Sequence, residues 1–128
     1  LITTYENSTY CKPNPKYYEE IIQKMADKIY RVRIFEDENE KMNLSLPQVG
    51  GEILSISQFT LYADCKKGNR PSFSLAGERH HAEKMYLYFN EYMRSLGVKV
   101  DEGIFGADMK VRLLNDGPVT IILDSSEW

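Results

Sequence analysis

Apolar residues recur at helical spacing in two stretches of the sequence. The first opens on Asn14 and Pro15, a capping residue followed by a first-turn proline, and continues with the apolar residues Tyr18, Ile21, Ile22, Met25 and Ile29. The second, residues 78–96, has the apolar stripe Ala82, Met85, Tyr86, Phe89, Met93 and Leu96, and Gly97 suits its C-terminal cap. The pattern predicts two amphipathic helices, the first of about four turns.

Alternating and β-branched apolar residues predict strands between and after these helices. We expect strands over residues 31–35, 52–62 (buried), 98–106 (a short strand and turn), 109–113 (with one solvated face) and 119–123. Residues 3–15, 36–41, 63–71 and 115–118 are typical of loops and turns. The sequence thus predicts an α+β fold of one domain, in which two helices pack on a barrel-like sheet of mixed or antiparallel strands.

The composition is that of an ordinary folded domain. The 128 residues suit a single core, and 42% hydrophobic with 27% charged residues excludes intrinsic disorder. A net charge of −3 argues against a broad basic coat for nucleic acid, although a local basic patch stays open. Apolar runs fall far short of the ~20 residues of a membrane span. Cys11 and Cys65 show no CxxC spacing and the first residues do not form a signal peptide, so we expect reduced thiols and a cytoplasmic protein.

Common catalytic and metal-binding motifs are missing from the sequence. His80 and His81 are adjacent, so on a helix they point about 100° apart and cannot chelate one ion together; we expect two solvated residues in the first turn. There is no HExxH, GxSxG, P-loop or GxGxxG motif, and we expect no metal and no cofactor. A serine–histidine–aspartate triad stays open, because its members need not be near in sequence.

Three polar residues interrupt the apolar run of residues 52–62. Ser57, Gln58 and Thr60 surround Phe59. Buried hydroxyls and amides are costly unless they form hydrogen bonds. These residues therefore either pair with the backbone of an ordinary strand or line a reacting centre, and the pattern alone leaves both open.

The NDGP turn and the loop after the polar strand also have a structural and a functional interpretation. The NDGP turn is most simply a turn between strands. However, Gly117 tolerates positive φ and its bond to Pro118 can be cis, so a rigid turn can aim backbone carbonyls outward as a steric wall. Lys66, Lys67 and Arg70 either belong to a solvated loop or contact phosphate beside a site.

Together these segments resemble one family, the D-aminoacyl-tRNA deacylases. The matching stretches are RIFEDENEKMNLSL (33–46), GGEILSISQFTLYADCKKGNRPSFSLA (50–76), GIFGADMKV (103–111) and NDGPVTIILD (115–124). The resemblance extends from about Ala26 to Asp124, and the SQFTL and NDGPVT segments are its most specific signatures.

The resemblance implies a homodimeric enzyme that hydrolyses the ester joining a D-amino acid, or mischarged glycine, to the terminal adenosine of tRNA. The dipeptide Gly117–Pro118 matches a cis-proline element that enters the partner subunit's site and excludes L-amino acids by its backbone carbonyls. Residues 57–60 match the segment that lines the reacting centre. Phe105 and Met109 fall at the family's adenine-contacting positions.

This assignment agrees with the lack of an evident base, metal or triad. An aminoacyl ester is already activated, and the neighbouring ribose hydroxyl can help water to attack, so the protein supplies mainly positioning and oxyanion donors. Backbone N–H groups around Phe59 and Thr60 suit the latter role. Thr60 is also a possible nucleophile in such a family, but no adjacent base is visible to activate it, and we favour substrate-assisted hydrolysis.

The start of the chain departs from the family pattern. Strands of the MRVVIQRV and LLVLLGV type are expected before the first helix, and residues 3–15 resemble a loop instead. We therefore expect residues 1–128 to form one deacylase domain that lacks the family's N-terminal strands. Two rival hypotheses are an editing domain of synthetase type and a catalytically silent module of the same fold that binds tRNA or another nucleic acid.

Overall fold

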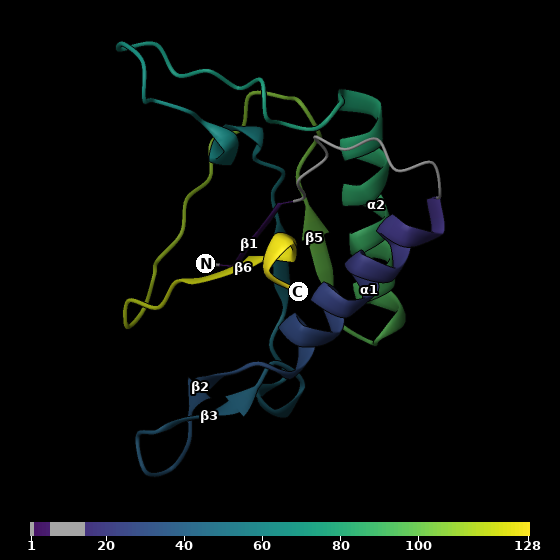
Figure 1. The fold of residues 1–128 in the computed structure, drawn as a ribbon. Coiled ribbons are helices and arrows are strands. Elements are labelled where there is room, and N and C mark those ends of the chain that lie inside the picture. Colours follow the sequence, from purple (N-terminus) through teal and green to yellow (C-terminus); the bar gives the residue numbers. More distant parts are fainter. Residues whose placement is uncertain (1, 6–14) are drawn as a thin grey trace.

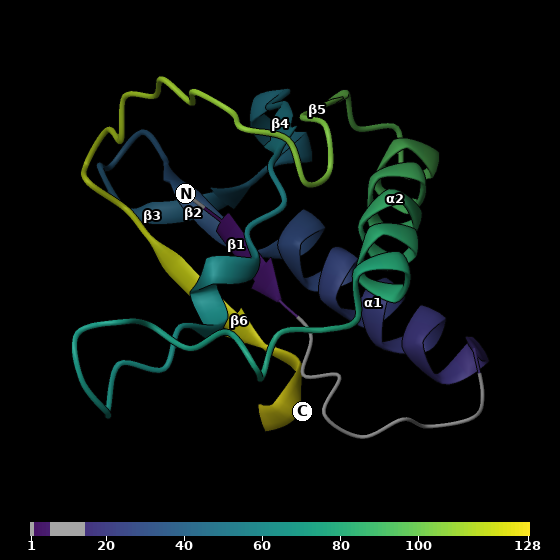
Figure 2. The same ribbon diagram turned by 90° about the horizontal axis from the view of Figure 1, so that it is seen from above.

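The computed structural model describes residues 2–5 and 15–128 of the chain. Along the chain lie β1 (Ile2–Tyr5), α1 (Pro15–Arg31), β2 (Arg33–Glu36), β3 (Met42–Ser45), the 3-10 turn η1 (Pro47–Val49), β4 (Ile53–Ser55), the 3-10 turn η2 (Phe59–Tyr62), α2 (Arg79–Ser95), β5 (Val100–Glu102), β6 (Ile121–Asp124) and the 3-10 turn η3 (Ser125–Glu127). The two helices lie together on one side of the molecule and the strands on the other, which confirms the α+β class (Figures 1 and 2).

Both predicted helices are present, and their ends follow the expected signals. Pro15 is the first residue of α1. The carboxylate of Glu78 caps α2 by accepting hydrogen bonds from the backbone N–H groups of His80 and His81. Gly97, just beyond α2, has φ 85°, the left-handed conformation that glycine adopts at little cost.

Side chains from both helices and the neighbouring strands build the core. Its main cluster contains Ala26, Ile29, Leu46, Met93, Val98 and Val100. Polar bridges also join the helices: Gln23 Nε2 donates to Tyr88 Oη at 2.6 Å, and Tyr92 Oη donates to Asp27 Oδ1 at 3.1 Å. The side chain of Asn90 is fully buried in the same layer.

The described strands form three two-stranded sheets. Parallel pairing joins β1 to β6 and β4 to β5, and antiparallel pairing joins β2 to β3. The β2–β3 hairpin projects from one end of the molecule (Figure 1). Mixed strand directions are therefore confirmed, whereas a single barrel-like sheet stays a prediction.

Two predicted strands are wrong in whole or in part. The predicted strand over 52–62 ends at Ser55, and Phe59–Tyr62 form a 3-10 turn instead. Residues 109–113 form no strand, and the side chains of Val111 and Leu113 are 45% and 55% exposed. The apolar side chains at alternate positions of this segment therefore lie on a face that no described strand or helix covers.

Smaller differences concern one additional strand, the N-terminal segment and the ends of two strands. β3 (Met42–Ser45) lies where no strand was predicted; it pairs with β2, the strand predicted over residues 31–35. Residues 3–5 of the predicted N-terminal loop belong to β1, and residues 6–14 lie outside the described part of the chain. The strands predicted over 98–106 and 119–123 correspond to β5 and β6, each with shifted ends.

Candidate functional site

The polar segment that follows β4 leaves the sheet and becomes exposed. Ser57 is half-buried, whereas Gln58 and Thr60 are exposed. Gln58 Nε2 donates a hydrogen bond to Thr60 Oγ1 at 2.5 Å. The Phe59 ring packs edge-on against Phe73 with centroids 5.1 Å apart, yet 60% of this side chain remains accessible. The segment therefore presents a hydroxyl, an amide and an aromatic ring to solvent at the end of a strand.

The same segment offers backbone donors. The first N–H groups of a helical turn have no partner within the turn. Within the described part of the chain, no hydrogen bond reaches the N–H of Phe59 or Thr60. Neither donor is used within this part of the chain.

Residues 103–109 carry the two predicted adenine contacts, Phe105 and Met109, and are called the predicted adenine-binding segment below; they are attached to the same strand. The carbonyl of Ser55 accepts two hydrogen bonds, from Gly103 N at 3.2 Å and from Tyr86 Oη at 2.8 Å. The Tyr86 ring in turn lies 6.0 Å from the Phe105 ring. Because Ser55 is the last residue of β4, this carbonyl joins the predicted adenine-binding segment to the start of the predicted reacting centre.

Met109 folds back onto the start of this segment. Its thioether sulfur lies against Gly103, where a β-carbon would collide with it, and the side chain of Ile56 also lies close to this position. The absence of a side chain at Gly103 therefore leaves the space that Met109 occupies. The segment therefore contacts β4 through Gly103 and α2 through Phe105.

The NDGP turn is separate from these residues within one chain. The Gly117–Pro118 peptide bond is cis, and both residues are exposed. Asn115 closes the turn: its Oδ1 accepts a hydrogen bond from Val119 N at 3.0 Å. In both ribbon views the turn lies at the edge of the molecule, away from η2 (Figures 1 and 2).

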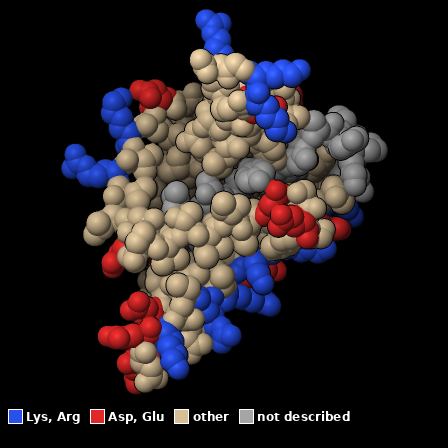
Figure 3. All heavy atoms as spheres, turned by 60° about the vertical axis from the view of Figure 1, so that its left-hand side comes forward, with Lys and Arg blue, Asp and Glu red and all other residues tan. Residues whose placement is uncertain are grey.

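The predicted basic residues lie on an exposed loop. A bridge between Asp64 and Ser72 closes this loop, and Lys66, Lys67 and Arg70 are all exposed within it. Figure 3 shows several lysine and arginine side chains around the upper part of the face drawn, with fewer acidic ones among them, and a closer mixture of both signs at its lower end. A local basic region is therefore compatible with the net charge of −3.

The histidine pair differs from the prediction in one member. His80 is exposed as expected, but His81 is half-buried and its ring packs on Tyr18 at 4.4 Å, so the expectation that both are solvated is wrong.

Hydrogen bonds from the backbone N–H groups of both histidines hold the pKa of Glu78 below its ordinary value. Among the described residues, no group of three or more His, Cys, Asp or Glu is placed to hold a metal ion.

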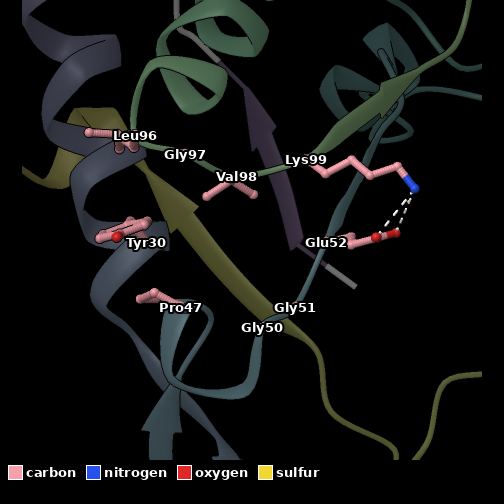
Figure 4. A pocket seen from close by; sticks show the side chains of 9 residues that line it. All are labelled: Tyr30, Pro47, Gly50, Gly51, Glu52, Leu96, Gly97, Val98 and Lys99. Carbon is pink, nitrogen blue, oxygen red and sulfur yellow. Dashed lines mark hydrogen bonds and ion pairs between the residues drawn. The ribbon is translucent and has the colours of Figure 1, made fainter.

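A cleft of about 260 Å³ opens at the other end of β4, lined by Tyr30, Pro47, Gly50, Gly51, Glu52, Leu96, Gly97, Val98 and Lys99 (Figure 4). Lys99 Nζ lies 3.2 Å from the carboxylate of Glu52 at its rim, and this hydrogen bond raises the pKa of Lys99. None of the predicted site residues lines it, so the cleft is a separate feature.

The sequence analysis did not single out a buried polar side chain, Asn90, where α2 contacts β5. Asn90 is fully buried, and its Nδ2 donates to Glu102 Oε2 at 2.7 Å. Arg94 contacts the same carboxylate oxygen at 3.1 Å, and its pKa is raised chiefly by a hydrogen bond to Glu91. Asn90 occupies a position where the spacing of the apolar stripe calls for an apolar side chain, and that mismatch was the available signal.

Comparison with known proteins identifies the family. A model of the D-Tyr-tRNA(Tyr) deacylase family matches residues 14–124. The chain belongs to this family. Among its relatives, the D-aminoacyl-tRNA deacylase of Bifidobacterium animalis subsp. lactis is 61% identical over 103 residues, 80% of this chain and 65% of the relative. That of Halothermothrix orenii is 53% identical over 109 residues, 85% of this chain and 73% of the relative. The resemblance inferred from SQFTL and NDGPVT is thus confirmed.

A solved structure shares the fold of this deacylase family member. It is named c-Myc DNA Unwinding Element Binding Protein, is 34% identical, superposes with a TM-score of 0.73, and is matched over 92% of this chain and 75% of its own. This chain spans 65% and 62% of the length of two Bifidobacterium relatives. No helix among the described residues is long and apolar enough to cross a membrane.

Proposed function

We propose that this protein hydrolyses the ester bond of D-aminoacyl-tRNA, and of tRNA mischarged with glycine, to release the amino acid and free tRNA. The observation that carries the proposal is the pair of hydrogen bonds that the carbonyl of Ser55 accepts from Gly103 and Tyr86. In a chain of this family, one strand end joins the polar segment 57–60 to the segment 103–109 that carries Phe105 and Met109. This shared attachment supports the proposal that the two segments form the aminoacyl and adenosine parts of one site.

In the proposed mechanism, the terminal adenine packs on Phe105 and Met109 and the ester carbonyl lies against the start of η2. The N–H groups of Phe59 and Thr60 stabilise the oxyanion that forms when water attacks. The ribose hydroxyl beside the ester assists the water, and positioning supplies most of the acceleration. Lys66, Lys67 and Arg70 attract the tRNA phosphates.

Thr60 is proposed to position the substrate rather than to attack it. A threonine nucleophile needs a neighbouring base to take its proton. The partner of its hydroxyl is the amide of Gln58, which is not a base whichever of its atoms faces Thr60. Ser57 and Gln58 therefore orient the segment, and the reaction is proposed to need no metal or cofactor.

We further propose that the protein acts as a homodimer in the cytoplasm, with Gly117–Pro118 of one copy entering the site of the other. The exposure of this turn and its distance from η2 in its own chain support the exchange. The residues beside the turn are unusually apolar for a surface: Leu114 is 91% and Ile122 71% exposed. Backbone carbonyls presented in this way would reject L-amino acids by steric exclusion.

A catalytically silent module that binds nucleic acid is the second candidate. The name of the structurally similar c-Myc DNA Unwinding Element Binding Protein favours it. The retained Ser57, Gln58 and Thr60 segment argues against it, because a silent module has no need of these residues.

A gel shift with uncharged tRNA, run beside an assay of D-tyrosyl-tRNA hydrolysis, separates the two candidates. Binding together with release of D-tyrosine supports the deacylase. Binding without release at any protein concentration supports the silent module.

A further inference from the structure

Arg79, the first residue of α2, packs on the predicted adenine-binding segment. Its guanidinium lies against Gly106: Nη2 is 2.9 Å, and Cζ 3.4 Å, from the point where a β-carbon would lie on that glycine. Gly106 has φ 74°, a conformation that favours glycine. The backbone at this residue therefore leaves room for the flat guanidinium group.

The contact of Arg79 with Gly106 lies next to the contact of Tyr86 with Phe105, on the same face of α2. Arg79 and Tyr86 are seven residues apart, so they lie within about 20° of each other around the helix axis. Tyr86 contacts the ring of Phe105, and Arg79 contacts the next residue, Gly106. The helix thus places one cation directly beside the predicted adenine contact.

Among the described residues, no carboxylate neutralises the charge of Arg79. The guanidinium forms no ion pair and no hydrogen bond within the described part of the chain. The neighbouring carboxylate of Glu78 is directed to the N–H groups that start α2. By contrast, Arg94 near the other end of the helix is paired with both Glu91 and Glu102. An exposed, unpaired and planar guanidinium is suited to a phosphate diester, which it can bind through two parallel hydrogen bonds.

We propose that Arg79 binds the phosphodiester that joins the last two nucleotides of the tRNA 3′ end. The inference rests on the proposed function, because that function places the terminal adenosine on Phe105 and Met109. In that arrangement the phosphodiester, one ribose away from the adenine, would lie beside the Arg79 guanidinium that rests on Gly106. Arg79 would fix the ribose, and hence the ester, relative to η2.

The test uses direct binding of a labelled, uncharged ACCA tetranucleotide, so that it does not depend on catalysis. A second oligonucleotide carries an uncharged methylphosphonate at its last linkage. The variants are Arg79→Ala and Arg79→Lys. The matched control is Lys84→Ala, which removes an exposed cation from the same helix about 140° around its axis.

We expect Arg79→Ala to weaken binding of the natural oligonucleotide about tenfold and to reduce its salt slope by about 0.7. The methylphosphonate should weaken binding to the unmodified protein similarly, and the two changes together should cost no more than either alone. Arg79→Lys should recover part of the loss, and Lys84→Ala should match the parent protein.

The inference is overturned if Arg79→Ala weakens both oligonucleotides equally, changes neither, or acts no differently from Lys84→Ala. It is also overturned if the parent protein does not distinguish the two oligonucleotides. Arg79-dependent binding combined with no release of D-tyrosine from D-tyrosyl-tRNA would refute the proposed function while leaving the phosphate contact in place.

Discussion

Replacement of the buried amide of Asn90 by a carboxyl group tests the polar network that Asn90 forms with Glu102 and Arg94 between α2 and β5. Asn90 is inaccessible to solvent and donates from Nδ2 to Glu102 Oε2 at 2.7 Å. Asn90→Asp keeps the shape of the side chain but sets a second carboxyl group against Glu102. Glu102 ends β5, immediately before the Gly103 N–H that is bonded to Ser55.

The magnitude follows from this distance. At an effective dielectric constant of about 20, two negative charges 2.7 Å apart repel by ~6 kcal/mol. The folded variant can escape this repulsion if one of the two carboxylates takes up a proton. Protonating a carboxylate of ordinary pKa, about 4, costs about 1.4 kcal/mol for each pH unit above that value. The loss of folding free energy is therefore limited to ~5.5 kcal/mol at pH 8 and ~2 kcal/mol at pH 5.5. Because the guanidinium of Arg94 lies 3.1 Å from the same Glu102 oxygen, it offsets part of the repulsion. We expect Asn90→Asp to lower the free energy of unfolding by ~4 kcal/mol at pH 8 and ~2 kcal/mol at pH 5.5.

Urea unfolding followed by circular dichroism at both pH values, with the parent protein as reference, measures this loss. The folded variant binds a proton more strongly than its unfolded chain, so its free energy of unfolding must fall as pH rises. Adding Glu102→Gln should restore most of the stability at pH 8, since an amide can donate to the introduced carboxylate. A loss below ~1 kcal/mol at pH 8, an equal loss at both pH values, or no rescue would refute the reasoning.

Three further changes have defined outcomes. Thr60→Ala should retain substantial turnover of D-tyrosyl-tRNA; a loss of about three orders of magnitude, or a trapped acyl adduct on Thr60, would identify it as the nucleophile. Gly103→Ala should displace Met109 and raise KM with little change in kcat or melting temperature; an unchanged KM would contradict the proposed contact between Met109 and adenine. Glu78→Ala should lower the melting temperature at neutral pH, and the difference from the parent should vanish in acid, below the lowered pKa of this carboxyl; a difference that persists there would show that the cap does not act through its charge.

The helices were predictable because their signals are local. Apolar spacing fixes which face is buried, while Pro15, Glu78 and Gly97 mark ends that depend on only a few neighbouring residues. Both helices were therefore placed to within about two residues.

The strands were less predictable because alternation does not reveal a partner. The apolar run 52–62 continues beyond Ser55, but the chain turns there, with Phe59 packing on the distant Phe73 and η2 replacing the strand. Apolar and basic residues alternate over 109–113 as in a strand, yet no described strand pairs with this segment. Pairing depends on residues far away in sequence, which periodicity cannot show.

The site shows the same division. The candidate residues of the SQFTL and GIFGADM segments could be singled out from the sequence, but the contacts that join these two segments could not. The shared carbonyl of Ser55 and the contact of Arg79 with Gly106 depend on tertiary packing, so no local pattern announces them.

The most direct test of the central claim is the release of tyrosine from D-tyrosyl-tRNA and L-tyrosyl-tRNA, measured side by side with a chelator present. Rapid release from the D form alone, undiminished by the chelator, is the predicted result. Equal release from both forms would contradict the proposed steric exclusion of L-amino acids, and release from neither would contradict the assignment of this chain as an active deacylase.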